Sequence, residues 1–147
     1  MTDVRVKRLY KEASFPAQGS TGAAGYDLRA CVKDGSIKIE PGETVMLGTG
    51  LSMEVPEGYF LGIFARSGLA VKQGLRPPMC VGIIDSDYRG EIMTPLHNDS
   101  KTTQEIHNGD RLAQAILIPC ATINFIETDE LKESERGTGG FGSTGIE

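Results

Sequence analysis

Tryptophan is absent from the sequence, and cysteine and histidine are scarce, with three cysteines and two histidines among 147 residues. Cys31, Cys80 and Cys120 are odd in number and far apart, so they predict neither a disulfide framework nor a zinc site and favour a reducing compartment. His97 and His107 lack the spacing and the cysteine neighbours of metal ligands. We therefore expect a cytoplasmic protein in which protein side chains alone hold no metal.

Long apolar runs and an excess of positive charge are also missing. The first seven residues carry charges but no apolar stretch, so we expect neither a signal peptide nor a membrane span. The net charge of −5 argues against broad electrostatic binding to nucleic acid or to an anionic membrane. A polyanionic ligand must then be held by local cations, by a helix N-terminus or through a metal ion.

Short alternating segments dominate the chain, and turn signals separate them about every ten residues. This pattern predicts an all-β jelly-roll sandwich or barrel with one short helix. Residues 1–127 are expected to form this domain, and residues 128–147, which are charged and then rich in glycine, a flexible C-terminal arm. The predicted strands include 4–10, 26–31, 37–39, 44–55, 59–65, 112–118 and 121–126.

Residues 79–92 predict a β-hairpin, because two apolar runs flank the turn-rich segment 86–90. Asp85 follows two isoleucines, and we expect this carboxylate to be semi-buried, which is costly unless it has partners. Tyr88 places an aromatic ring at the turn, and Gly90 leaves bare backbone beside it. The hairpin is a candidate pocket wall, although an ordinary hairpin with a solvated turn stays open on these residues alone.

Residues 66–74 break the β pattern and predict a helix of about two turns. Ser67 is a suitable N-cap, and Gly74 is a suitable residue to end the helix. Arg66, the Ser67 hydroxyl and free backbone N–H groups would converge on one point, which suits a phosphate. A capped connector helix with an exposed arginine is the other interpretation.

The glycine-rich end, residues 137–145, contains the pattern G-x-G-x-x-G. It has neither the strand and helix of a dinucleotide-binding fold nor the lysine of a phosphate-binding P-loop. Arg136 and the Ser143 and Thr144 hydroxyls nevertheless surround a lone ring, Phe141, in backbone rich in N–H donors. Such a strip suits a base stacked above a phosphate chain, whereas a disordered tail is the plainer alternative.

Taken together, five segments resemble, in order, the five motifs of the trimeric dUTPase family. They are AAGYDLRA at 23–30, RSGLA at 66–70, GIIDSDYRG at 82–90, NGDRLAQ at 108–114 and RGTGGFGSTG at 136–145. Each segment alone is a weak signal, but five in the family's order along almost the whole chain are specific.

The resemblance implies a dUTPase-like jelly-roll homotrimer whose three active sites are each built from all three chains. The implied reaction converts dUTP to dUMP and pyrophosphate, which keeps uracil out of DNA and supplies dUMP for thymidylate synthesis. Asp85 is implied to position and deprotonate the water that attacks the α-phosphorus. The implied cofactor is Mg²⁺ bound through the triphosphate; Asp27 could reach that ion through a water but is not counted as a ligand.

The resemblance also implies a set of substrate-binding residues. The base and sugar would contact Met79, Gly82, Ile83, Ile84, Tyr88 and Met93, with Tyr88 packed under the deoxyribose. The phosphates would contact Arg66, Ser67, the Gly68 N–H and Gln114. The arm would contribute Arg136, Phe141, Gly142, Ser143 and Thr144, with Phe141 stacked on uracil.

Met79 departs from the family pattern, which usually has asparagine three residues before Gly82. Methionine cannot donate or accept hydrogen bonds as that amide does, so uracil recognition is expected to depend on backbone contacts. A dCTP deaminase of the same fold and a non-enzymatic nucleotide-binding trimer that signals to a protein partner are alternative functions. The spacing from Asp85 to Tyr88 favours the hydrolase over the deaminase, and the intact Asp85 and arm favour retained hydrolysis.

Overall fold

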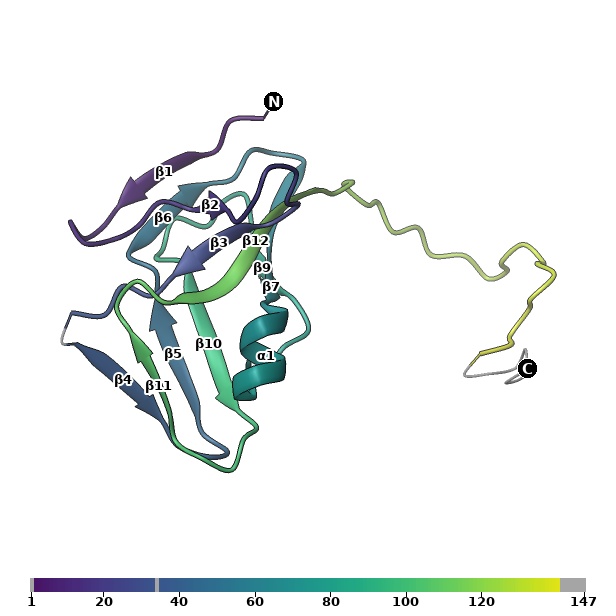
Figure 1. Cartoon of the computed structure of the whole chain (residues 1–147). Coiled ribbons are helices and arrows are strands. Elements are labelled where there is room, and N and C mark those ends of the chain that lie inside the picture. The colour runs from purple at the N-terminus through teal and green to yellow at the C-terminus, as the bar shows by residue number, and fades with distance from the viewer. Residues whose placement is uncertain (1, 34, 141–147) are drawn as a thin grey trace.

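The computed structural model describes residues 2–33 and 35–140, which are mostly β with one short helix. The elements in chain order are β1 (Arg5–Arg8), β2 (Ala17–Gln18), β3 (Tyr26–Arg29), β4 (Ser36–Ile39), β5 (Thr44–Gly48), β6 (Leu51–Glu54), β7 (Tyr59–Ala65), α1 (Ser67–Gln73), β8 (Leu75–Arg76), β9 (Gly82–Ile84), β10 (Met93–Asn98), β11 (Gln104–His107) and β12 (Arg111–Pro119). The predicted all-β architecture with one short helix is therefore confirmed (Figure 1).

The largest sheet has the strand order β2-β3-β12-β7-β9, and a second sheet has the order β5-β10-β8. Two further antiparallel pairs join β1 to β6 and β4 to β11. In the largest sheet β12 runs antiparallel to β7 from Ala113 opposite Ala65 to Pro119 opposite Tyr59. Because this ladder covers the whole of β7, positions in the neighbouring strands can be given by the β7 residue that each one lies opposite.

The core lies between the inner faces of the sheets, because alternate residues of each strand point inward. Leu28 on β3 and Leu112 on β12 are fully buried, as are Leu47 on β5 and Leu96 on β10. Burying a leucine side chain stabilises the fold by roughly 1.5–3 kcal/mol relative to leaving it in water. These four leucines, from four different strands, therefore join the sheets into one core.

The short helix begins one residue earlier than its predicted cap implies. Arg66 occupies the N-cap with extended backbone (φ −92°, ψ 123°), and Ser67 is the first helical residue, without a side-chain capping hydrogen bond. The prediction of Ser67 as N-cap is thus wrong, whereas Gly74 ends the helix in the left-handed region (φ 67°) as expected. Among the described residues no helix is long and apolar enough to span a membrane.

The predicted hairpin at 79–92 is wrong. β9 pairs with β7, whereas β10 pairs with β5 and β8, so the segment between them crosses from one sheet to the other. Ile92 is fully buried at this crossing, and its N–H donates to the Leu51 carbonyl at 2.8 Å. Two apolar runs around a turn are equally compatible with a hairpin and with a crossing, and packing against different sheets decides between them.

The predicted strand at 121–126 is also wrong, because residues 120–140 contain no strand. Figure 1 shows this segment leaving the body after β12. Ile123, Phe125 and Ile126 are exposed there by 66%, 88% and 79%. An extended segment becomes a strand only when it pairs with another, and residues 121–126 pair with no described strand.

Candidate active site

Three side chains, those of Asp27, Arg66 and Arg111, form an ion-paired cluster, here called the Asp27 cluster, at the end of β7 that leads into α1. The Asp27 carboxylate accepts a hydrogen bond from Arg66 Nε at 2.9 Å and pairs with Arg111 Nη1 at 3.4 Å. Gln114 lies beside the cluster, opposite Asp27 on the neighbouring strand β12. The Asp27 side chain is 14% exposed and that of Arg66 is 23% exposed. The cluster is thus partly shielded from water, which strengthens its charge interactions.

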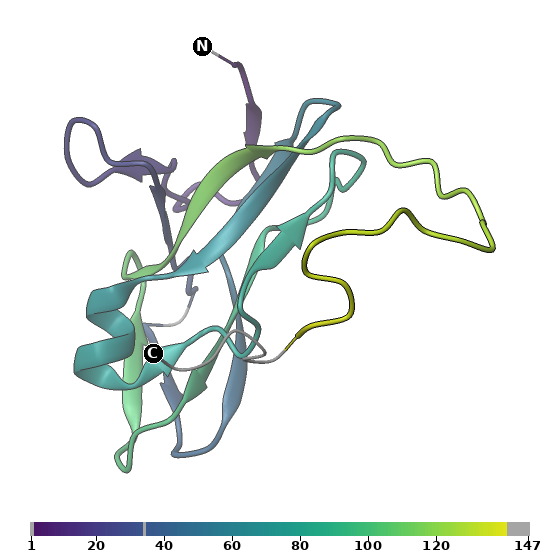
Figure 2. The same cartoon turned by 90° about the vertical axis from the view of Figure 1, so that its right-hand side faces the viewer.

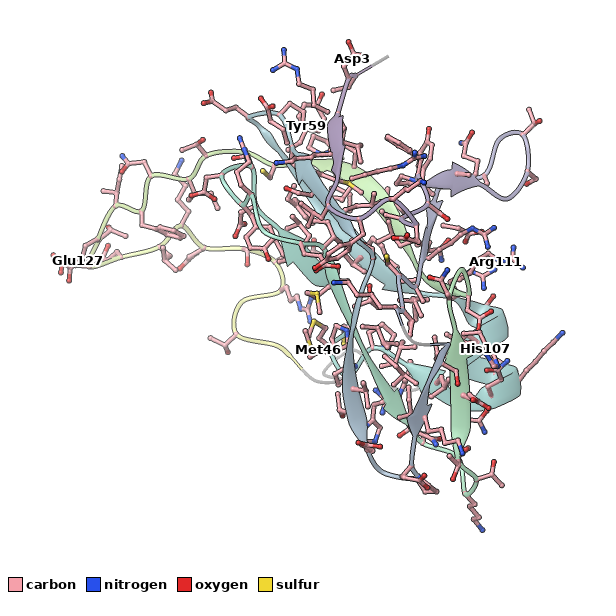
Figure 3. The ribbon with its side chains drawn as sticks, turned by 90° about the vertical axis from the view of Figure 1, so that its left-hand side faces the viewer. Asp3, Met46, Tyr59, His107, Arg111 and Glu127 are labelled. Carbon is pink, nitrogen blue, oxygen red and sulfur yellow. The ribbon has the colours of Figure 1, made fainter. Side chains whose placement is uncertain are left out.

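Strand register brings these residues together from distant parts of the chain. Asp27 on β3 lies opposite Gln114 on β12, and Gln114 lies opposite Phe64 on β7, so Arg66 follows at the same end. Gln114 Nε2 donates to the Ala65 carbonyl at 3.0 Å. A Cβ at Gly25 would lie 2.6 Å from Gln114 Oε1 and 3.1 Å from Gln114 Cβ, so the Gln114 side chain packs closely over the Gly25 backbone. In Figure 3 Arg111 and Tyr59 are labelled at opposite ends of this sheet.

Ser67 and Gly68 follow Arg66 in the first turn of α1, and both are exposed. No atom lies within 4 Å of the position that a Cβ on Gly68 would take. The structure therefore gathers all four residues expected to bind phosphates, namely Arg66, Ser67, Gly68 and Gln114, around one end of β7, with open space beside them.

The residues expected to contact the base line a pocket of about 370 Å³ between β9 and the sheet that contains β10. Its lining consists of Thr44, Met46, Ile63, Pro77, Pro78, Met79, Gly82, Ile83, Ile84, Met93, Thr94 and Pro95. Five of these were predicted, and Met46 on β5, labelled in Figure 3, was missed because it lies outside every motif. The walls are almost entirely apolar, so hydrogen bonds to a base would have to come mainly from backbone.

The backbone of β9 is available for such bonds. Within residues 2–33 and 35–140, β9 is the last strand of its sheet and pairs only with β7, so one edge of it has no partner strand there. Gly82 packs against Ile63, whose Cβ would lie 3.2 Å from an added Cβ. This edge, together with the apolar pocket, offers a planar polar ligand both hydrogen bonds and contact area.

Tyr88 and Gly90 lie in the segment that follows β9. Tyr88 Oη donates to the Glu91 carbonyl at 3.0 Å, and its ring lies where a Cβ on Gly90 would stand. The bare backbone at Gly90 is therefore required by the Tyr88 ring of the same chain. Tyr88 is 41% exposed, so part of the residue is accessible from outside.

Asp85 is exposed, and the prediction that its carboxylate is semi-buried is wrong for the single chain. Among the described residues no hydrogen bond or ion pair reaches this carboxylate. The physical reason is the edge position of β9, which leaves nothing of the described chain to pack over it. Since Ile84 lies opposite Leu61, Asp85 stands level with Phe60, at the far end of β7 from Arg66.

The separation of Asp85 from Arg66 follows from strand geometry. Phe60 and Arg66 are six residue steps apart, which corresponds to about 20 Å along an extended strand. Figure 2 shows the same arrangement, with α1 at one end of β7 and the loop after β9 at the other. One chain therefore does not bring the Asp85 carboxylate to the Asp27 cluster.

The arm residues are only partly described. Arg136 is exposed, and its Nε donates to the Gly139 carbonyl at 2.8 Å. Phe141, Gly142, Ser143 and Thr144 lie outside the described residues. Within residues 2–33 and 35–140, no group of three or more His, Cys, Asp or Glu side chains is placed to hold a metal ion.

Comparison with known proteins identifies the family of the chain. The family model described as dUTPase matches residues 11–145. A deoxyuridine 5'-triphosphate nucleotidohydrolase of Acinetobacter baumannii is 45% identical over 139 residues, which cover 94% of this chain and 92% of that protein. The protein of the same name from Nautilia profundicola is 46% identical over 142 residues, covering 97% and 98%.

Solved structures agree with the sequence comparison. The dUTPase of Staphylococcus bacteriophage 80alpha with dUPNHPP superposes with a TM-score of 0.90 at 27% identity, covering 99% of this chain and 100% of that one. A G164S variant of that dUTPase with dUpNHpp gives a TM-score of 0.89. The fold is thus the jelly roll of these enzymes. The chain belongs to the dUTPase family, a family of dUTP diphosphatases.

Proposed function

We propose that this chain hydrolyses dUTP to dUMP and pyrophosphate, and thereby keeps uracil out of DNA and supplies dUMP for thymidylate synthesis. The observation that carries the proposal is the clustering of the predicted phosphate-binding residues around the Asp27 cluster. The family match and the names of the curated relatives support dUTP as the nucleotide. An anion of high charge needs such local cations, because the protein as a whole is negatively charged.

The base is proposed to enter the apolar pocket beside β9. Backbone N–H and C=O groups of Gly82, Ile83 and Ile84 would read its polar edge, and Met79 and Met93 would contact its faces and rim. The confined pocket would reject a 5-methyl group by shape. Tyr88 would pack under the deoxyribose and exclude a 2′-hydroxyl.

The chemistry is proposed to depend on Asp85. Its carboxylate would position a water, accept the proton of that water and direct the oxygen onto the α-phosphorus, with pyrophosphate as the leaving group. Proton transfer by a positioned carboxylate contributes roughly 10²–10⁴-fold to a rate. Arg66, Ser67, the Gly68 N–H and Gln114 would hold the phosphates, since phosphoryl transfer depends mainly on positioning and on neutralising charge.

The donor set suits a metal ion that is held by the phosphates. The Asp27 carboxylate is already engaged by two arginines, and the described residues provide no cluster of metal-ligating side chains. We propose that Mg²⁺ is bound through the triphosphate, where it would supply charge neutralisation.

The separation along β7 supports a composite site. Because Asp85 and Arg66 of one chain lie about 20 Å apart along the strand, we propose that Asp85 of one copy faces Arg66 of another copy in a homotrimer. The exposed arm, including Arg136, would then close over a site together with residues 141–144. Closure of this kind excludes bulk water and strengthens the local charges.

A pyrophosphate-release assay with dUTP, dTTP, UTP and dCTP, with and without Mg²⁺, tests the proposal. Release from dUTP alone among the four, dependent on Mg²⁺, is the expected result. Ammonia release from dCTP would indicate a deaminase instead. Binding of dUTP without any release would support a nucleotide-binding protein that is not an enzyme.

A further inference from the structure

Three of the five methionines in the sequence line the apolar pocket beside β9. Met46 on β5 and Met79 before β9 are 57% and 46% exposed, and Met93 at the start of β10 is half-buried. Met53, in contrast, is 3% exposed and belongs to the core. In the described part of the chain, all the accessible methionines therefore belong to this one pocket.

Strand register holds two of these side chains close together. Met46 lies opposite Pro95 in the β10–β5 ladder, and Pro95 follows Met93 by two residues. Met46 and Met93 are thus diagonal neighbours on one face of the sheet, a separation of about 7–8 Å that long side chains can bridge. Met79 reaches the same pocket from the segment between β8 and β9.

The accessibility of these sulfurs is tied to the use of the pocket. A base can enter only a pocket that is open to solvent, so a molecule as small as hydrogen peroxide reaches the same walls. Methionine sulfur is readily oxidised to the sulfoxide, which replaces a flexible apolar side chain by a polar one. The chain thus combines a site that must stay open with side chains that an oxidant converts.

A sulfoxide oxygen would be poorly accommodated in this pocket. The rest of the lining is mostly aliphatic, from Ile63, Ile83, Ile84 and three prolines, and it offers such an oxygen few donors. A polar group that is buried without a partner costs about tenfold or more in an equilibrium constant. The two carbonyl oxygens of uracil would also be repelled, since a sulfoxide accepts hydrogen bonds and cannot donate them.

We propose that Met46, Met79 and Met93 form a modification site, at which reversible oxidation by hydrogen peroxide lowers the affinity of the pocket for the base. In each step the sulfur lone pair attacks one peroxide oxygen, the O–O bond breaks and an S–O bond forms. The sulfur loses two electrons, the peroxide is reduced, and the proton of the transferred oxygen leaves with the released hydroxide as water. This inference rests on the proposed function of the pocket.

The first test maps the oxidation. The protein is treated with dilute hydrogen peroxide and then with dithiothreitol, which returns disulfides and sulfenic acids of the cysteines to thiols and leaves sulfoxides in place. Peptide mass spectrometry is expected to find sulfoxide at Met46, Met79 and Met93 and not at Met53. KM for dUTP is expected to rise about tenfold, with kcat unchanged. A KM that stays constant when all three sulfurs are oxidised would overturn the proposal.

Matched variants show whether these sulfurs cause the loss. The triple variant Met46→Leu, Met79→Leu, Met93→Leu is compared with Met53→Leu, and each oxidised sample is compared with its own untreated sample. Peroxide is expected to leave KM of the triple variant constant and to raise that of Met53→Leu about tenfold. A triple variant as sensitive as wild type would contradict the proposal.

Repair supplies a second check on the chemistry. The two methionine sulfoxide reductases, one for each sulfoxide epimer, are expected to return KM of the oxidised wild type to its starting value. A KM that stays raised although mass spectrometry shows the sulfoxides removed would mean that another oxidation is responsible, and would overturn the proposal.

Binding measured by calorimetry separates this proposal from the proposed function. Oxidation is expected to weaken binding of dUMP about tenfold and to leave binding of inorganic tripolyphosphate unchanged, because the phosphate-binding residues contain no sulfur. Equal weakening of both ligands would indicate general damage and contradict a site in the base pocket. Failure of the untreated protein to release pyrophosphate from dUTP would refute the proposed function, whereas full oxidation of the three sulfurs with undiminished dUMP binding would refute the modification site.

Discussion

The candidate site residues at the two ends of β7 differ in how many partners one chain gives them. At the end that leads into α1, Arg66 is partly buried, ion-paired to Asp27 and placed beside a Gln114 that is itself held by the Ala65 carbonyl. At the other end Asp85 is exposed, on an edge strand, and no described residue contacts its carboxylate.

This difference fits the two roles proposed for the ends, which are phosphate binding beside α1 and activation of water at Asp85. Groups that bind phosphate must be preorganised before the ligand arrives, and the ladders of one chain suffice for that. A carboxylate that activates water must lie in a closed site, and the single chain leaves that part open. Under the proposed function, the end that carries Asp85 is therefore the part that would depend on other copies and on the arm.

The largest expected effect on activity comes from a substitution at the end of β7 where Asp85 is exposed. Asp85→Asn is expected to reduce pyrophosphate release by at least about 10³-fold, because the amide cannot accept the proton of the attacking water. Binding of dUTP is expected to change little, since the phosphate-binding end is intact. Steady-state kinetics and calorimetry measure the two properties.

Asp87→Asn is the matched control for Asp85→Asn, because it removes an exposed carboxylate from the same segment. It is expected to retain wild-type turnover. Equal losses in the two variants would mean that this segment is disturbed as a whole and would contradict a specific role for Asp85.

The arm should matter for turnover and not for folding. Truncation after Arg136 is expected to lower kcat by about 10²-fold, which is the size of effect that loss of a closing element produces. The melting temperature should stay within about 2 °C of wild type, since residues 120–140 pack little against the body. A truncated chain that fails to fold would show that the arm belongs to the core.

The smallest expected effect concerns the pocket. Met79→Asn is expected to lower KM for dUTP by about fivefold, the value of one net hydrogen bond of about 1 kcal/mol. Met79→Leu, which keeps the wall apolar, should leave KM unchanged. An unchanged KM in Met79→Asn would mean that position 79 does not face the base.

The sequence predicted those features that depend on local pattern. Alternation and turn signals indicated the strands, and Gly74 indicated where α1 ends. Five of the residues expected at the base do line one pocket, because they all lie between positions 79 and 93 of the chain. Local pattern suffices here since each of these features is set by residues close together in the chain.

The remaining features depend on contacts between distant segments. Whether 79–92 forms a hairpin is decided by which sheet each run packs against, and composition is the same in both cases. The ion pairs of Asp27 with Arg66 and Arg111 join three separate segments through strand register. The prediction that Asp85 is semi-buried was wrong because β9 is an edge strand and no described segment of the chain covers Asp85.

Mixing two inactive variants tests the composite site most directly. Arg66→Ala and Asp85→Asn chains are unfolded together, refolded as a mixture and assayed for pyrophosphate release from dUTP. If each site takes its two halves from different copies, random assembly restores about a quarter of wild-type activity. A mixture no more active than the two variants refolded separately would contradict the account.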